Sequence, residues 1–313
     1  MYRYVLKRIL FLIPTILGVI FIILFVLNLT PGDPGRSILG PSAPQEAVDQ
    51  LNEELGYNDP LLVKYVKYIK RLVVDHSFGV SYFTKQLVMD EVLGRFWVTL
   101  KLSIIGIIIS TLVGVPLGML TAVKQYSIWD YIPSMIAFLL AAVPAFVLGM
   151  TLLLIFSVKL NWLPSYGLST WKCYIMPSLC MAIPITAFNV RFTKSSMLES
   201  IRADYIDTAR AKGAKEKTVI WKHALKNALL PVVTNIGLNM GGLIMGAVVA
   251  ERLFSVPGIG ALIVDRINYK DEPVIIAGTI VIAITFTIIM LIVDVVYAFI
   301  DPRIKAKYTR IKG

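Results

Sequence analysis

Long apolar stretches recur along the chain and are separated by shorter polar segments. A helix that crosses the roughly 30 Å hydrocarbon layer of a bilayer needs about 20 largely apolar residues. The fourth stretch is the shortest and contains Pro177, Pro184 and Asn189, which membrane helices tolerate where neighbouring helices cover the freed backbone groups. The pattern predicts an all-α integral membrane protein with six transmembrane helices, at residues 9–29, 98–123, 133–158, 174–190, 229–250 and 273–300.

Composition agrees with this interpretation. Hydrophobic residues make up 57% of the 313 residues and charged residues 16%, and the mean hydropathy is +0.73. Soluble domains have roughly 45–50% apolar and about 25% charged residues, so a soluble enzyme is excluded. We therefore interpret the net charge of +11 as a topology signal rather than a sign of nucleic-acid binding. The two cysteines and two histidines lack the spacing of a metal site.

The distribution of lysine and arginine predicts the orientation of the chain. Three precede the first span, nine lie between residues 191 and 226, and five follow residue 302. The connections after the third and fifth spans carry only two and three. Because basic residues concentrate on the cytoplasmic side, we expect both termini and the nine-charge segment to be cytoplasmic.

Residues 31–96 are too patterned to be a simple linker. Helix starts are expected near Pro44 and Pro60, and apolar residues after Pro60 recur at helical spacing. This segment is predicted to form an external helical cap, which serves either as a docking surface or as a structural lid. The predicted division is a tail and first span at 1–30, the cap at 31–96, and a five-helix core at 97–313.

The basic segment at residues 191–230 is predicted to hold two short amphipathic helices. Ser200 is expected to cap the first, which ends at Gly213 because glycine readily takes positive φ. The second is predicted at 216–230, and Pro231 is expected to begin the fifth span. Such a helix, joined rigidly to a span, would act as a lever. The expected apolar faces are Ile201, Tyr205, Thr208 and Ala209 in the first helix and Val219, Ile220, His223, Ala224 and Ala228 in the second.

The fifth span is more polar than a lipid-facing helix requires. Asn235 and Asn239 lie one turn apart on one face, and the same span contains several glycines. Small and amide residues allow close helix packing, and a polar stripe also suits the wall of a translocation path. Both interpretations stay open, and the two asparagines are our candidates for path-lining residues.

Short motifs spread over nearly the whole chain resemble those of one transporter family. Asp207, Thr208 and Ala209, followed by Gly213 and residues 228–231 (ALLP), look like the EAA loop of ATP-binding cassette import permeases. The acid is Asp207 instead of glutamate, and the loop after Gly213 is longer than in sugar importers. The chain is most similar to the dipeptide, oligopeptide and nickel permease group, of the DppB or OppB type. Further matches lie at residues 29–34 (LTPGDP), 163–167 (LPSYG), 251–260 (ERLFSVPGIG) and 294–303.

The resemblance implies a type I importer permease fold with a coupling helix seated in a groove of a cytoplasmic ATPase. It implies a heterodimer with a homologous permease, two ATPase chains and an external substrate-binding protein, in a prokaryotic cytoplasmic membrane. The substrate would be a di- or oligopeptide. The candidate coupling residues are Asp204, Tyr205, Asp207, Thr208, Ala209, Arg210, Ala211, Lys212, Gly213 and Ala214.

The energy source has to come from other chains. No G-x-x-x-x-G-K-[ST] phosphate loop occurs in the sequence, so we expect no ATP hydrolysis and no cofactor here, with ATP and Mg on the partner subunits. One alternative is the same kind of importer carrying nickel or another small solute. Two others come from different classes: an ion-driven secondary transporter, whose buried ionisable residues we do not find, and a membrane scaffold or receptor that binds anionic lipid.

Overall fold

The computed structural model describes the backbone of residues 2–300 and the side chains of residues 6–296, and this part of the chain is almost entirely helical. The five basic residues of the C-terminal tail and the end of the 294–303 motif lie outside the described residues. The helices form two compact units. Among the described residues, one unit contains 2–99 and 257–287, and the other contains 100–256 and 288–300.

The first unit holds α1 (Tyr2–Leu29), α2 (Pro34–Leu39), α3 (Gln45–Glu54), α4 (Leu61–Val73) and α12 (Ile259–Asn268). The second holds α6 (Ile128–Ala142), α7 (Ala145–Leu152), η1 (Leu153–Lys159), η2 (Trp171–Tyr174), α8 (Ile175–Ile201), α9 (Asp204–Ala211), α10 (Glu216–Thr218), η3 (Val219–Ala224) and α11 (Leu225–Leu253). Two long helices have residues in both units, α5 (Val88–Val123) and α13 (Glu272–Ile300).

The predicted membrane spans are present as helices. Five described helices are long and apolar enough to cross a membrane, and the number is six if one bent pair is counted as a single span. The fourth span is longer than predicted, because α8 continues to Ile201 through Pro184. The basic segment therefore begins inside a long helix.

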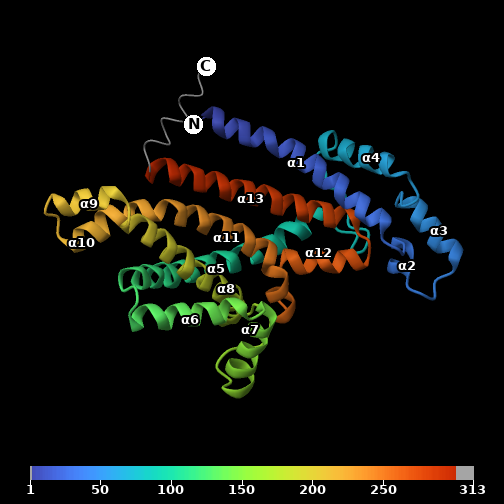
Figure 1. Cartoon of the computed structure of the whole chain (residues 1–313). Helices are drawn as coiled ribbons and strands as arrows, with labels where there is room; N and C mark the ends of the chain where they lie inside the picture. Colours follow the sequence, from blue (N-terminus) through green and yellow to red (C-terminus); the bar gives the residue numbers. More distant parts are fainter. Residues whose placement is uncertain (1, 301–313) are drawn as a thin grey trace. The chain divides into compact units, whose positions relative to one another are not determined.

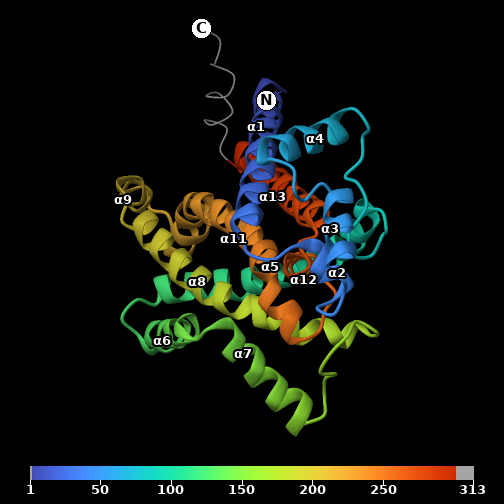
Figure 2. The same cartoon turned by 90° about the vertical axis from the view of Figure 1, so that its right-hand side faces the viewer.

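The third predicted span, residues 133–158, is not straight. It consists of α6 followed by α7 and η1, with a bend of 102° between the two parts (Figure 2). Val143, at the break, is extended with φ −82° and ψ 125°. The next residue is Pro144, which disfavours the helical conformation of the residue before it and cannot donate a backbone hydrogen bond. Pro144 therefore favours a break in the helix at this position.

Pro231 does not begin a helix, in contrast to the prediction. Helical structure runs without a break from Glu216 to Leu253, with a π-helical turn at η3 and Pro231 inside α11. Local π adjustments and neighbouring helices can satisfy the backbone groups that a membrane proline frees. The second short helix and the fifth span are therefore joined by continuous helical structure, as predicted.

The predicted cap helices are confirmed at α3 and α4. Pro44 and Pro60 precede them directly, as the sequence indicated. Tyr68 of α4 packs with Ile20 and Leu24 of α1 in a buried apolar cluster, and Figure 1 shows α4 beside α1. The apolar face of the amphipathic helix α4 is therefore packed against α1.

Close packing of α5 on α8 depends on two glycines four residues apart. A Cβ atom at Gly118 would lie 2.6 Å from both the Val190 carbonyl oxygen and Thr193 Cβ, and one at Gly114 would lie 2.7 Å from Asn189 Cβ. Side chains at either position would push the helices apart. This is the small-xxx-small spacing that brings membrane helices together.

We expect Gly118→Ala to lower the free energy of unfolding by about 1–3 kcal/mol, because overpacking a tight contact forces backbone shifts. Denaturant unfolding of the purified chain in detergent micelles measures the change. Gly242→Ala is the matched control, since a Cβ there meets nothing within 4 Å and alanine is the better helix former. Equal stability of the two variants would contradict the packing argument.

Candidate functional site

The predicted coupling residues form α9 and the turn that follows it. Ile206 of α9 is fully buried and packs with Met197 of α8 and with Val219, Ala224 and Ala228 of the following helical stretch. Ala209 and Ala214 lie against the same cluster. Figure 1 shows α9 and α10 together at one end of α11. The short helix is therefore fastened by apolar contacts to the two long helices that flank it.

Arg210 links the two ends of this turn. Its guanidinium donates hydrogen bonds to both carboxylate oxygens of Glu216, at 3.2 and 2.9 Å, and one to Asp207 at 3.2 Å. The Asp207 and Glu216 side chains are 75% and 57% exposed. Exposed ion pairs contribute little stability, so the apolar contacts of Ile206 contribute more than these ion pairs to holding α9 in place.

Gly213 takes the positive φ that the sequence predicted, at +78°. A Cβ there would meet nothing within 4 Å, so space is not what the position requires. L side chains avoid this backbone region, and among non-glycine residues asparagine and aspartate enter it most readily. The glycine therefore sets the direction in which the chain turns from α9 to α10.

Two details of the predicted first helix are wrong. Ser200 does not cap it, because it lies inside α8, where its hydroxyl donates to the Ala224 carbonyl at 2.8 Å and pairs with the Tyr205 hydroxyl at 2.6 Å. The predicted apolar face is wrong in part, because only Ile201 and Ala209 of its four residues pack against the buried cluster. Tyr205 and Thr208 are exposed, and Ile206 between them is buried.

The outer face of α9 is polar and accessible. Its side chains carry charges of both signs and one aromatic ring, so it can accept both ionic and stacking contacts from another molecule. Most of the predicted coupling residues lie on this face or the following turn, and Ala209 and Ala214 lie partly on the inner side. The exposed positions are Asp204, Tyr205, Asp207, Thr208, Arg210, Ala211, Lys212 and Gly213.

Asn235 and Asn239 point to a common partner. Both side-chain amides donate to the side-chain oxygen Oδ1 of Asn189 in α8, at 3.1 and 3.0 Å, and the Asn189 side-chain amide donates to the backbone carbonyl of Ser110 in α5 at 3.4 Å. Asn235 is buried and Asn239 half-buried. The cluster ties three long helices together through polar bonds, which explains the amides as packing contacts and leaves one of them partly accessible.

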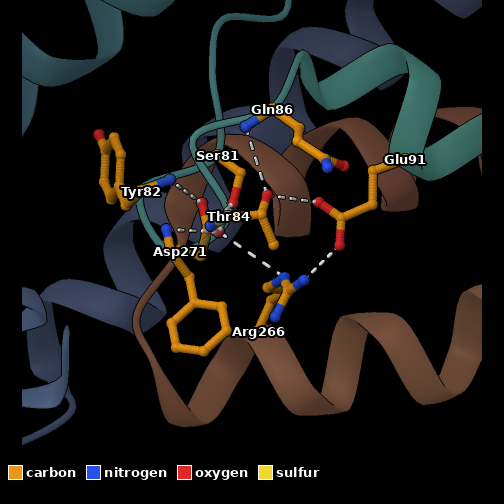
Figure 3. Close-up of polar contacts among 8 residues, drawn as sticks. Ser81, Tyr82, Thr84, Gln86, Glu91, Arg266 and Asp271 are labelled. Atoms are coloured by element: carbon orange, nitrogen blue, oxygen red, sulfur yellow. Dashed lines mark hydrogen bonds and ion pairs between the residues drawn. The ribbon is translucent and has the colours of Figure 1, made fainter.

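A second polar cluster lies in the other unit and was not predicted (Figure 3). The carboxylate of Asp271 accepts hydrogen bonds from the Ser81 hydroxyl at 2.5 Å and from the backbone N–H groups of Tyr82 and Phe83 at 3.0 and 3.4 Å. Burial raises the pKa of this carboxyl above its ordinary value, and the hydrogen bonds act in the opposite direction. The loop after residue 80 is thereby anchored beside the start of α13.

Arg266 of α12 completes this cluster. Its guanidinium forms a hydrogen-bonded ion pair with Glu91 of α5 and lies 3.7 Å from an Asp271 oxygen. The Arg266 and Glu91 side chains are only 9% and 8% exposed, and the Thr84 hydroxyl donates to Glu91 at 3.1 Å. Buried charges need such partners. The cluster holds one loop and the ends of three helices in a fixed arrangement.

Two known families each match a part of the chain. The family described as "Binding-protein-dependent transport system inner membrane component" matches residues 114–306, and the family of the N-terminal part of such membrane components matches residues 1–103. The chain is 41% identical over 307 residues to the "Glutathione transport system permease protein GsiC" of Salmonella paratyphi A, and 40% identical to that of Escherichia coli K12. Each match covers 98% of this chain and 100% of the relative.

A solved structure supports the helical arrangement. The methionine ABC transporter MetNI in an inward-facing conformation is similar with a TM-score of 0.56 at 18% sequence identity, over 68% of this chain and 97% of that chain. At this level of identity the likeness shows the fold alone.

Proposed function

The chain belongs to the family of binding-protein-dependent transport system inner membrane components, and we propose that it carries di- or oligopeptides. It is a multi-pass membrane permease subunit of an ABC importer and not an enzyme. The observation that carries the peptide assignment is the full-length similarity to permeases named for glutathione, which is itself a peptide. Family membership excludes the ion-driven transporter and the scaffold or receptor considered above.

The proposed partners follow from the kind of machine. Permeases of this family work with another permease, with ATPase chains and with a binding protein. We propose that this chain forms a heterodimer with a homologous permease, providing half of the path, and that two separate ATPase chains bind ATP and Mg. We propose that both termini and α9 face the cytoplasm and that the cap at 31–96 faces the outside, where the binding protein would approach.

The proposed coupling element is α9 with the turn at Gly213. Its apolar side is packed onto α8 and the stretch that continues into α11, whereas its polar side is exposed. Helical structure then continues to Leu253 without a break. Motion applied to the exposed side of α9 would therefore be passed to two membrane helices. Asn235 and Asn239 stay candidates for the path wall, because Asn239 is only half-buried by this chain.

Reconstitution tests the function directly. We expect proteoliposomes that contain both permeases, the ATPases and the binding protein to accumulate labelled glutathione only with ATP, and unlabelled di- and tripeptides to compete. Competition by Ni²⁺ and not by peptides would favour the alternative importer for nickel. Uptake driven by an ion gradient without ATP would overturn the proposal altogether.

The same assay tests the turn at Gly213. Gly213→Val is expected to lower uptake several-fold, because forcing a β-branched residue to positive φ costs about 1–2 kcal/mol. Gly213→Asn, which tolerates this backbone region, is the matched control and should stay near the wild-type rate. If the two variants behave alike, the direction of the turn does not matter for coupling.

A further inference from the structure

A polar pocket in the cap is built like a ligand site. It has a volume of about 250 Å³ and is lined by the end of α3, by α4, by Tyr82 and by the start of α13. We call it the cap pocket. Drug-sized ligands occupy pockets of roughly 300–1,000 Å³, so a pocket of this size suits a smaller molecule. Its lining charges are Glu53, Glu54, Asp59, Lys64, Lys67, Arg71 and Glu272.

Several of these charges already have partners within the chain. Lys64 pairs with Glu272 at 3.2 Å, and Lys67 pairs with Asp59 at 2.6 Å. The exposed carboxylates of Glu53 and Glu54 and the guanidinium of Arg71 form no hydrogen bond or ion pair with the described residues. The pocket therefore keeps unpaired charge of both signs, with acids on α3 and a cation on α4.

Tyr68 adds an unsatisfied hydrogen-bonding group beside that cation. Tyr68 is only 5% exposed, and its hydroxyl has no hydrogen-bond partner within the described part of the chain. The Arg71 guanidinium carbon lies 5.7 Å from the Tyr68 ring centroid. Burial raises the pKa of the Tyr68 hydroxyl well above its ordinary value, so it stays a neutral donor. A buried hydroxyl left without a partner is destabilising.

These observations fit one class of ligand. A ligand carboxylate at the Arg71 end would accept hydrogen bonds from the guanidinium and from the Tyr68 hydroxyl. A ligand ammonium group at the α3 end would form ion pairs with Glu53 and Glu54. We propose that the cap pocket binds a small zwitterion with one ammonium and one carboxylate, such as a free amino acid or a dipeptide. The inference holds whichever solute the importer carries.

Binding to the full-length chain in lipid nanodiscs, without ATP or partner proteins, tests the inference. We expect L-alanine and glycylglycine to bind and to raise the unfolding temperature. N-acetylglycine, which lacks the ammonium, and glycinamide, which lacks the carboxylate, should bind at least about tenfold more weakly, since each leaves one end of the pocket unpaired. Equal binding of all four probes, or none, would overturn the proposal.

Tyr68→Phe separates a ligand role from a structural one. It is expected to weaken glycylglycine binding roughly tenfold or more, because it removes one donor to the carboxylate. Without probe, the variant should unfold at the same or a higher temperature than the wild type, since an unsatisfied hydroxyl is gone. Unchanged affinity in this variant would contradict the proposal.

Charge variants and matched controls complete the test. Arg71→Gln should weaken binding of N-acetylglycine, which carries only the carboxylate. Glu53→Gln combined with Glu54→Gln should weaken binding of glycinamide, which carries only the ammonium. Lys70→Gln, at the exposed neighbour of Arg71, and Tyr131→Phe, at a tyrosine that is 61% exposed, should change neither. Because no readout involves ATP-driven uptake, failure here is distinguishable from failure of the proposed function.

Discussion

Replacing Ile206 by alanine is expected to lower ATP-driven uptake at least about tenfold, the change that each 1.4 kcal/mol produces in an equilibrium. Ile206 is fully buried against α8 and the stretch leading into α11, and such a truncation costs about 2–5 kcal/mol. An isolated helix as short as α9 has almost no stability of its own. Loss of the Ile206 contacts should therefore detach α9 from α8 and α11 before the membrane helices unfold. Uptake by the reconstituted importer measures the result.

Two comparisons make this result interpretable. Val249→Ala truncates a side chain of α11 that is 43% exposed and should leave uptake near the wild-type rate. Protease accessibility of the Ile206→Ala variant should rise within residues 202–215 and not elsewhere. Should α9 become accessible while ATP-driven uptake stays normal, the helix would not be the coupling element.

The membrane helices could be predicted from sequence because long apolar runs leave few alternatives in a bilayer. The effect of prolines could not. Pro144 breaks the third span, whereas Pro184 and Pro231 lie inside continuous helices. All three have the same local chemistry, so the outcome depends on whether neighbouring groups satisfy the freed backbone. That information is tertiary and does not appear in a single sequence.

The candidate site was predictable in position but not in orientation. The sequence locates the helix at α9 and the turn at Gly213, and it places Ile201 and Ala209 correctly on the apolar face. It also places Tyr205 and Thr208 there, which are exposed, and leaves out the buried Ile206. A helix of 8 residues makes barely two turns, so several faces fit its pattern equally well. Asn189 was noted only as an obstacle to a span. Its role became visible with Asn235 and Asn239, which approach it from another helix.

Arg266→Leu is expected to cause the largest loss of stability in the unit that contains the cap. Glu91 and Asp271 would stay buried without their cation, and removing one partner of a buried ion pair costs about 3–5 kcal/mol. Globular domains have only about 5–15 kcal/mol of stability in total, so the loss should be plain in denaturant unfolding of the purified chain in micelles. Lys70→Leu, at an exposed position, should change the free energy of unfolding by no more than about 0.5 kcal/mol.

The double variant with Glu91→Leu tests whether the cost lies in the uncompensated carboxylate. In the absence of the Arg266 and Glu91 charges, the Asp271 carboxylate still accepts hydrogen bonds from the Ser81 hydroxyl and from two backbone N–H groups. The double variant should then be more stable than Arg266→Leu alone, because one stranded negative charge has been removed. If the stability losses of the two single variants simply add in the double variant, Arg266 does not act through the ion pair. It then acts through its packing on Phe83, whose ring centroid lies 5.0 Å from the guanidinium carbon.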